Sequence, residues 1–250
     1  MEELQKKEWA RPPVDDVGYI PSTKMLALSD DELKVLVEKF RTTRYTGWRN
    51  YEDKWRKFMG LDDTKGKTIL DFGCGVGIES LELSLNGNNV IAADIVDENV
   101  ELTKRIVNLY GKKVQTKVID WDFPYIDLPN HSIDILYMNG VLHHIPYAHD
   151  LIKKALNWIR PDGEIRAMLY SDRGWAKYTK STVPAFDSEV TLHPLFPKFL
   201  RVFDRVGFHA DWYSKERLEW RFGDLVNVVS YDYITNDDRY CVARMTPKLS

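Results

Sequence analysis

The chain has 250 residues, of which 44% are hydrophobic and 12% aromatic, enough for one α/β domain or two small ones to bury a core. This excludes a disordered tail and a disulfide-stapled miniprotein. A formal charge of -3 and a pI near 6.1 argue against bulk binding to nucleic acid or to a membrane surface. With two cysteines and neither a signal peptide nor a membrane-spanning run, the chain is expected to be reduced and cytoplasmic.

The N-terminal part is predicted to be an arm followed by two helices. Residues 1–28 show no hydrophobic period, so we expect an arm that is ordered only by packing and that doubles as a lid. A capping box begins at Ser29, and apolar residues at helical spacing follow it, which predicts a helix over 30–44. An aromatic-rich second helix is predicted over 48–59 and ends at a glycine.

From Lys67 onward, short apolar runs alternate with amphipathic helices, which indicates βαβ units and a parallel sheet. The predicted strands are Thr68–Phe72, Val90–Asp94, Val114–Ile119, Ile133–Met138 and Glu164–Tyr170. The predicted helices run from Ile78 to Leu85, from an N-cap at Asp97 to Gly111, through Ile152 to Ile159, and through Phe199 to Val206.

Two aromatic-rich stretches, 171–197 and 212–237, do not fit this alternation and are predicted as insertions over the sheet edge. The turn at 160–163 is expected to separate a helix from the fifth strand. A last strand over Tyr240–Met245 would be antiparallel if it formed a hairpin with a strand at Phe208–Trp212.

The run from Ile69 to Ile78 carries the most information about function. A strand that ends in Asp71 is followed by a loop with three alternating glycines and then by a helix, and such a turn lies where parallel sheets bind ligands. The run matches neither a dinucleotide-binding loop nor a P-loop. An acid two residues before the first glycine would repel a pyrophosphate but suits an ammonium group, such as that of S-adenosylmethionine.

Acids also end the next two predicted strands. Asp94 follows Asp71 by 23 positions, and its carboxylate can accept both hydroxyl groups of a ribose. Asp120 is followed by Trp121, which would place an acceptor for an adenine amino group beside an indole ring. Three acids on successive strand ends therefore predict one adenosine-type ligand.

These residues resemble the class I (Rossmann-like) S-adenosylmethionine-dependent methyltransferases of the small-molecule type. The resemblance covers the region 67–170 and rests on D-F-G-C-G-V-G from Asp71, the acids Asp94 and Asp120, and the segment from Ile133 to Ile145. It implies an α/β fold with a doubly wound, seven-stranded, mostly parallel sheet of order 3-2-1-4-5-7-6. It also implies S-adenosyl-L-methionine as the cofactor and S-adenosyl-L-homocysteine as the product.

The resemblance further implies a role for each cofactor-binding position. Asp71 and the glycine backbone would hold the methionyl part, Asp94 the ribose and the pair at 120–121 the adenine. Asn139 would lie under the methionyl chain. The full implied set is Asp71, Gly73, Cys74, Gly75, Asp94, Ile95, Asp120, Trp121 and Asn139.

The sequence after the fourth strand narrows the acceptor. The tetrapeptide from Asn139 to Leu142 differs from the Asn/Asp-Pro-Pro-Tyr/Phe motif of exocyclic-amine methyltransferases, and neither cysteine follows a proline as in cytosine-C5 enzymes. The Leu-His-His-Ile sequence resembles enzymes that act on sugars, quinones, lipids or peptide-like natural products. We therefore expect transfer to an oxygen or nitrogen of a small molecule.

His143 and His144 are the candidate general bases for a hydroxyl acceptor. One of them, His144 in particular, could instead be a structural histidine bonded to backbone, and His193 is a rival base. Adjacent histidines on a loop lack the ligand spacing of a known metal site, so no metal is predicted.

Four aromatic residues are the candidates for the acceptor pocket: Tyr45, Trp48, Trp175 and Tyr178. For Trp175 and Tyr178, packing of an insertion onto the sheet is the alternative. Arg41, Arg44 and Arg49 could receive a substrate phosphate or carboxylate, or could simply be solvated. Cys74 is expected to be a small loop residue and not a nucleophile.

We predict two parts of the chain, an N-terminal arm with helices on the lid and substrate side (1–62) and a methyltransferase domain (63–250) with a cap insertion at 171–197. Two alternatives stay open. One is a Rossmann-like subunit that binds the cofactor without catalysis, and the other is an RNA or protein methyltransferase with a local basic groove. The sequence names neither the acceptor nor the oligomeric state.

Overall fold

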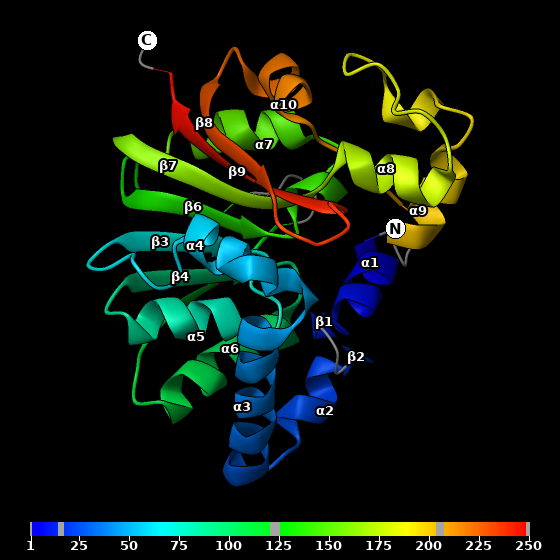
Figure 1. Ribbon diagram of the computed structural model, residues 1–250. Coiled ribbons are helices and arrows are strands. Elements are labelled where there is room, and N and C mark those ends of the chain that lie inside the picture. The colour runs from blue at the N-terminus through cyan, green and yellow to red at the C-terminus, as the bar shows by residue number, and fades with distance from the viewer. Residues whose placement is uncertain (1, 15–17, 121–125, 204–207, 249–250) are drawn as a thin grey trace. The chain divides into compact units, whose positions relative to one another are not determined.

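The computed structural model describes residues 2–14, 18–120, 126–203 and 208–248 (Figure 1). It contains two compact units, Met1–Leu128 and Pro129–Ser250. The first unit holds the predicted N-terminal part together with the first three strands of the sheet. The division at 62/63 therefore stays a prediction.

Within the described residues, one seven-stranded sheet has the order β5-β4-β3-β6-β7-β9-β8. Its strands are β3 (Thr68–Phe72), β4 (Asn89–Asp94), β5 (Gln115–Val118), β6 (Ile133–Asn139), β7 (Ile159–Tyr170), β8 (Val226–Tyr233) and β9 (Tyr240–Pro247). The pairs β3/β4, β4/β5 and β6/β7 are parallel, whereas β9 is antiparallel to β7 and β8. Numbered from β3, this is the order 3-2-1-4-5-7-6, so the predicted fold class is confirmed.

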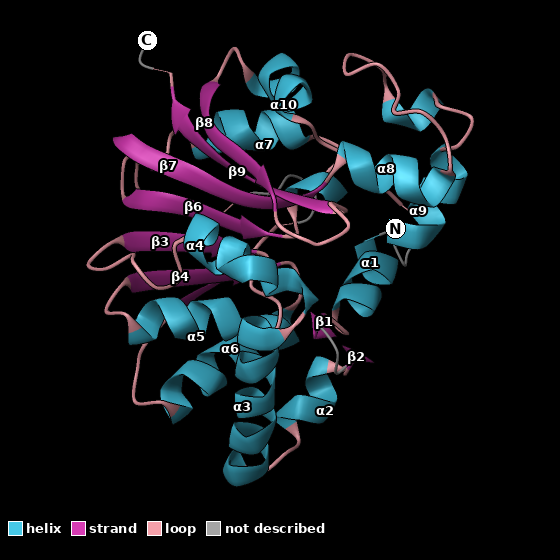
Figure 2. Ribbon diagram, in the orientation of Figure 1, coloured by secondary structure: helices cyan, strands magenta, loops and turns pink. Residues whose placement is uncertain are grey.

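Several helices accompany β3, β4 and β5 in the first unit (Figure 2). These are α1 (Glu2–Trp9), α2 (Ser22–Leu26), α3 (Asp30–Thr46), a 3-10 turn at Trp48–Asp53, α4 (Lys54–Met59), α5 (Ile78–Leu85) and α6 (Asp97–Leu109). A core formed by α2, α3, α5 and α6 includes Phe40, Leu81 and Ile106, all fully buried. Both β3 and β4 are apolar along nearly their whole length, as expected for parallel strands covered on two faces.

The N-terminal arm is more regular than its sequence suggests. It contains α1, α2 and a short ladder in which β1 (Pro13–Val14) pairs antiparallel with β2 (Gly18–Tyr19). The capping box of α3 is confirmed, because the Ser29 hydroxyl accepts from the Glu32 amide and the Glu32 carboxylate accepts from the Ser29 amide. The arm is ordered by contacts with distant segments, which a search for hydrophobic periods does not detect.

The predicted single helix over 48–59 is wrong. The backbone leaves helical geometry from Asn50 to Glu52, and α4 begins only at Lys54. The Asn50 side chain explains the break, since its amide donates to the Asp53 carboxylate at 3.0 Å and its oxygen accepts from the Arg56 amide at 3.2 Å. An asparagine side chain that binds nearby backbone in this way competes with the helix.

The second unit carries β6 to β9 and six short helical segments among its described residues. Those that matter here are a 3-10 turn at Leu142–His144, α7 (Ala148–Ala155), α8 (Asp172–Thr179), a 3-10 turn at Val190–Leu192, α9 (Phe196–Phe203) and α10 (Lys215–Phe222). A second core joins β7 to α8 and α9 through Tyr170, Trp175 and Phe199. In Figure 2, α10 lies beside β8 and α7.

Two predictions for this unit need correction. The stretch 212–237 is not an insertion, because it contains α10 and the edge strand β8. The last strand pairs with β7 and β8 and not with Phe208–Trp212. The residues of β8 are mostly half-buried and mix polar with apolar side chains, so this strand lacks the apolar run that marks the interior strands.

The fifth strand also begins earlier than predicted. β7 starts at Ile159, so the residues predicted as a helix end and turn lie within the strand, and a register irregularity between Ile133 and Ile135 of β6 accommodates them. In α9, Val202 is 49% exposed and is not on the buried face. Val206 of the same predicted helix lies outside the described residues.

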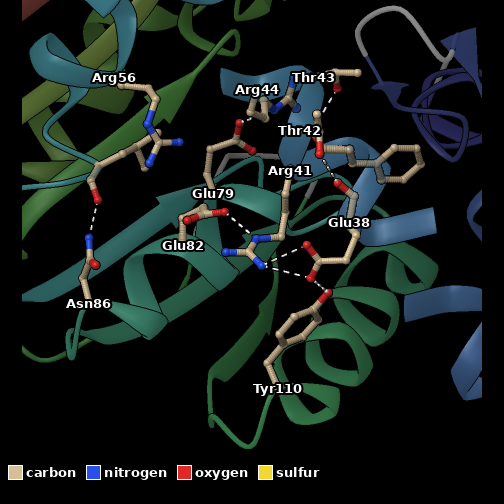
Figure 3. Close-up of polar contacts among 12 residues, drawn as sticks. Glu38, Arg41, Thr42, Thr43, Arg44, Arg56, Glu79, Glu82, Asn86 and Tyr110 are labelled. Atoms are coloured by element: carbon tan, nitrogen blue, oxygen red, sulfur yellow. Dashed lines mark hydrogen bonds and ion pairs between the residues drawn. The ribbon is translucent and has the colours of Figure 1, made fainter. Parts of the chain in front are cut away.

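Two arginines of α3 pair with glutamates of α5 (Figure 3). Arg41 lies 2.7 Å from the Glu82 carboxylate, and Arg44 lies 2.8 Å from the Glu79 carboxylate. Both side chains of the second pair are under a tenth exposed. Arg49 is also buried, with its guanidinium over the rings of Trp48 and Trp55. These three arginines form contacts within the first unit. They are therefore not simply solvated, which was the alternative left open from the sequence.

We predict that Arg44→Met lowers the free energy of unfolding by about 3 kcal/mol or more, because it leaves the Glu79 carboxylate buried without its cation. The double variant Arg44→Met/Glu79→Gln should regain part of this loss. Lys215→Met is the control, since its pair with Glu219 is exposed and should contribute little. Urea unfolding measures all three, and equal effects of Arg44→Met and Lys215→Met would contradict the prediction.

Candidate active site

The glycine loop joins the end of β3 to the start of α5. The amides of Gly73 and Cys74 both donate to the Ala93 carbonyl of β4, at 2.7 and 3.0 Å. Gly73, Gly75 and Gly77 have φ values of 79°, 54° and 77°, which are strained for any residue with a side chain. The alternating glycines are therefore required by a loop that turns tightly at the carboxyl end of the sheet.

Asp71 lies in β3 at the start of this loop and is buried. Its carboxylate accepts a 2.5 Å hydrogen bond from the Ser80 hydroxyl of α5. Burial raises the pKa of Asp71 to about 7, and the charges of Glu79 and Asp94 add to the increase. The carboxylate is thus held in a place where its negative charge is costly.

Asp94 ends β4 and faces the same loop. Its Oδ2 accepts from the Gly75 amide at 2.9 Å, and its Oδ1 accepts from the Val96 amide at 3.0 Å and from the Asn99 side chain at 3.2 Å. Burial raises the pKa of Asp94 to about 6, although these hydrogen bonds act in the opposite direction. The bonds fix the orientation of the carboxylate against the glycine loop.

The two buried carboxylates of this site suit a ligand that carries a positive charge and hydroxyl groups. Among the residues that the structure describes, neither Asp71 nor Asp94 forms an ion pair with a lysine or arginine. An ammonium group beside Asp71 would therefore stabilise its charged form. The two buried acids beside the loop are those that the resemblance assigns to the methionyl and ribose parts of S-adenosylmethionine.

The other implied cofactor residues of the first unit are placed as follows. Cys74 is buried, its Sγ lies 3.4 Å from the Thr103 hydroxyl, and burial raises its pKa well above the usual range, which disfavours a reactive thiolate. Ile95 is half-buried directly after Asp94, and Asp120 is exposed just after β5. Trp121 lies outside the described residues.

The sequence analysis missed two polar residues that contact this site. Ser80 donates to Asp71, and Asn99 donates to Asp94. Asn99 did leave a signal, because it occupies a buried position on the α6 face that also carries Leu102 and Ile106. A polar residue on an apolar helix face is expected to have a specific partner.

In the second unit, the loop after β6 carries the remaining implied residues. Asn139 ends β6, is half-buried and lies opposite Met168 of β7. Gly140 has a φ of 79°, and its amide donates to the Met168 carbonyl at 3.1 Å. The chain then enters the short 3-10 turn that contains both candidate histidines.

Both histidines contact backbone groups. His143 is 1% exposed, its Nδ1 accepts from the Tyr170 amide at 3.4 Å, and burial lowers its pKa well below the usual value. The ring of His143 lies 3.7 Å from that of Tyr170. His144 is half-buried, and its Nδ1 donates to the His209 carbonyl at 3.1 Å. A backbone contact therefore does not distinguish His144 from His143.

The Tyr170 hydroxyl has two possible hydrogen-bond acceptors, the His144 imidazole and the Phe203 carbonyl. The His144 Nε2 lies 3.1 Å from the Tyr170 hydroxyl oxygen, and that hydroxyl also donates to the Phe203 carbonyl at 2.5 Å. Because a hydroxyl has one proton, it serves either the carbonyl or the imidazole. If His144 takes up a proton at Nε2, it can donate to Tyr170 while Tyr170 keeps its bond to Phe203.

The aromatic candidates differ in exposure. Trp175 is fully buried and packs against Phe199 and His193, as in the packing alternative. Tyr178 is half-buried beside Phe203. Trp48 is half-buried under Arg49. For Tyr45, only the backbone, at the end of α3, lies within the description.

Two searches of the described residues bear on other kinds of site. No group of three or more histidine, cysteine, aspartate or glutamate side chains is arranged to hold a metal ion. No described helix combines the length and the apolar character needed to cross a membrane.

A family model matches most of the chain. Residues 40–225 match the model of a methyltransferase domain. Phosphoethanolamine N-methyltransferase 3 of Arabidopsis thaliana is 32% identical over 107 residues, which cover 42% of this chain and 22% of the relative. Sterol 24-C-methyltransferase of Pneumocystis carinii is 25% identical over 203 residues, which cover 73% of this chain and 51% of the relative. The chain thus spans from about a fifth to half of these relatives.

The fold has solved counterparts. A SAM-dependent methyltransferase from Aquifex aeolicus superposes with a TM-score of 0.55 at 17% identity, over 88% of this chain and 98% of that one. Together with the domain match, this confirms the resemblance noted from the sequence and the expected cofactor, S-adenosylmethionine.

We predict that Gly77→Ala destabilises the protein more than Gly87→Ala. Both glycines have positive φ, which costs an alanine about 1–2 kcal/mol. At Gly77 the added methyl group would also lie 2.5 Å from the Thr103 Oγ1 and 2.8 Å from its Cα, whereas at Gly87 nothing lies within 4 Å. Thermal unfolding of both variants tests this, and equal losses would show that Thr103 does not constrain the loop.

Proposed function

Because the chain belongs to the family of methyltransferase domains, we propose that it transfers a methyl group from S-adenosylmethionine to an oxygen or nitrogen of a small molecule, such as a sugar or another natural product. The observation that carries this proposal is the pair of buried carboxylates, Asp71 and Asp94, beside the glycine loop. The bound cofactor would supply a methyl group already activated on a sulfonium sulfur.

Within the first unit, the residues have separate roles in this proposal. Asp71 binds the ammonium group, and the backbone of Gly73 and Gly75 accommodates the methionyl chain. Asp94 accepts from the ribose hydroxyl groups, in competition with the donors that the protein already supplies. Ile95 packs on the adenine. The assignments of Asp120, Trp121 and Asn139 continue to rest on the resemblance alone.

Several observations support a small acceptor. The named relatives act on phosphoethanolamine and on sterols, both small molecules. Arg41 and Arg44, which had been considered for an acidic substrate, are paired with glutamates of α5. The four aromatic candidates stay proposed as acceptor residues, with Tyr178 and Trp48 more exposed than Trp175.

Both cysteines are free and buried, which supports the proposed cytoplasmic location.

For a hydroxyl acceptor, a protein group has to take up a proton as the methyl group is transferred. Of the two candidate bases, we propose His144. His143 is fully enclosed, and its Nδ1 already accepts a backbone proton. His144 is half-buried, and its protonated form satisfies both Tyr170 and the His209 carbonyl. The rest of the contribution of the chain is alignment of the two reactants and exclusion of water.

We predict that S-adenosylmethionine and S-adenosylhomocysteine raise the melting temperature, whereas NAD does not. A ligand at 100 times its Kd adds about 2.7 kcal/mol to the stability. Asp94→Ala should reduce the affinity for both, because the ribose loses a charged partner. Stabilisation by NAD alone, or unchanged affinity in Asp94→Ala, would contradict the proposed site.

The same binding should release protons. The pKa of Asp71 is about 7 in the free protein, and a cationic ligand favours the charged carboxylate, so affinity should fall as the pH drops below that value. Calorimetry in buffers of different ionisation enthalpy measures the release. Asp71→Asn should abolish most of it, and a release that persists in this variant would assign the proton to another group.

We predict that His144→Gln lowers kcat toward a sugar or phenol hydroxyl by about 100-fold, while cofactor affinity and melting temperature stay close to the wild-type values. His143→Asn is the matched variant, since its side-chain oxygen can still accept from Tyr170. Radiolabelled methyl transfer measures the rates. A loss of stability in step with activity would instead identify His144 as structural.

A further inference from the structure

Asn99 connects three segments that are far apart in the sequence. Its side-chain amide nitrogen donates to the Asp94 Oδ1 at 3.2 Å and to the Trp9 carbonyl at 3.0 Å. Its side-chain oxygen accepts from the Ser22 hydroxyl at 2.5 Å. The residue is 1% exposed, so these bonds form away from water, where an unmade bond is expensive.

These contacts define the orientation of the amide. An asparagine has two N–H donors and one oxygen, and here both donors and the oxygen are engaged. A flipped amide would point its oxygen at two other acceptors, the Asp94 carboxylate and the Trp9 carbonyl. A single orientation of the Asn99 amide therefore links α6 to the end of α1 and to the start of α2.

The N-terminal chain also lies near the glycine loop. Pro12 is buried, and a Cβ added to Gly75 would lie 3.5 Å from the Pro12 Cβ. The amide of Gly75 donates to Asp94. Thus the N-terminal segment bonds to Asn99, which donates to Asp94, and it also lies near the loop whose Gly75 amide donates to the same carboxylate.

We propose that Asn99 is a positioning residue for the cofactor site: it holds the Asp94 carboxylate in its ligand-binding orientation and couples that orientation to docking of the N-terminal segment, defined here as the described residues 2–14 and 18–26. This inference rests on the proposed role of Asp94 in binding the cofactor. Ligand binding and order in the N-terminal segment then stabilise each other, because both depend on the same amide.

A double-mutant cycle on cofactor affinity tests the coupling. We expect Asn99→Ala to weaken S-adenosylhomocysteine binding about tenfold, which corresponds to about 1.4 kcal/mol, and Ser22→Ala to weaken it by a smaller factor. In the Asn99→Ala background, Ser22→Ala should have no further effect, since its hydroxyl acts through Asn99. Asn108→Ala is the control, an exposed asparagine on the same helix.

Hydrogen exchange gives a second readout that a loss of general stability would not reproduce. In the wild type, saturating S-adenosylhomocysteine should slow exchange in peptides from the N-terminal segment. In Asn99→Ala at saturation, this protection should be lost while protection of peptides from β3 and β4 is kept. If Asn99→Ala does not fold, Ser22→Ala alone should still reduce the ligand-induced protection of the segment.

The outcomes separate this inference from the proposed function. Failure of the wild type to bind S-adenosylhomocysteine would overturn the cofactor site itself. Normal binding by the wild type, with loss in Asp94→Ala but equal affinities for Asn99→Ala and Asn108→Ala, would overturn the role of Asn99 only. Additive effects of Asn99→Ala and Ser22→Ala, or unchanged protection in Ser22→Ala, would likewise overturn the coupling.

Discussion

Two carboxylates are buried at the carboxyl ends of adjacent parallel strands, and the surrounding residues of the first unit have to stabilise them. The register of β3 against β4 pairs Asp71 with Ala92, so Asp71 and Asp94 lie close enough for each charge to oppose the other. Burying a charge without a cation is costly. Hydrogen bonds offset part of this cost. Ser80 donates to Asp71, and Gly75, Val96 and Asn99 donate to Asp94.

This arrangement makes the free protein dependent on pH in a defined direction. Both pKa values are raised by folding, to about 7 and about 6. A group whose pKa is raised on folding contributes stability at low pH, and that contribution is lost as the pH increases through the folded value. The free chain is therefore penalised near neutrality by its own site, and a cationic ligand removes part of the penalty. In the proposed function, the same feature that weakens the fold favours cofactor binding.

Local sequence patterns were sufficient for the elements that local physics determines. The strand Thr68–Phe72, the helix Ile78–Leu85 and the capping box at Ser29 have the predicted positions, since each depends on neighbouring residues. The edge strand β8 and the break at Asn50 were missed, because both depend on polar side chains that carry no hydrophobic period. The positions of Asp71 and Asp94 on adjacent strands were predicted, whereas the contacts that orient their carboxylates were not. Asn99 meets its partner Trp9 across 90 positions, and no periodicity reports such a contact.

The arginines of α3 act on the proposed site through their glutamate partners on α5. Arg44 pairs with Glu79 of α5, and the next residue of α5, Ser80, donates to Asp71. Neutralising Glu79 matters because its charge raises the pKa of Asp71, so weakening the ion pair would make the Asp71 carboxylate harder to ionise. On the other side of the loop, Asn99 ties Asp94 to the N-terminal segment. The N-terminal third of the first unit thus acts on both acids, through charge at Asp71 and through geometry at Asp94, and changes there should alter cofactor affinity even where no atom touches the cofactor.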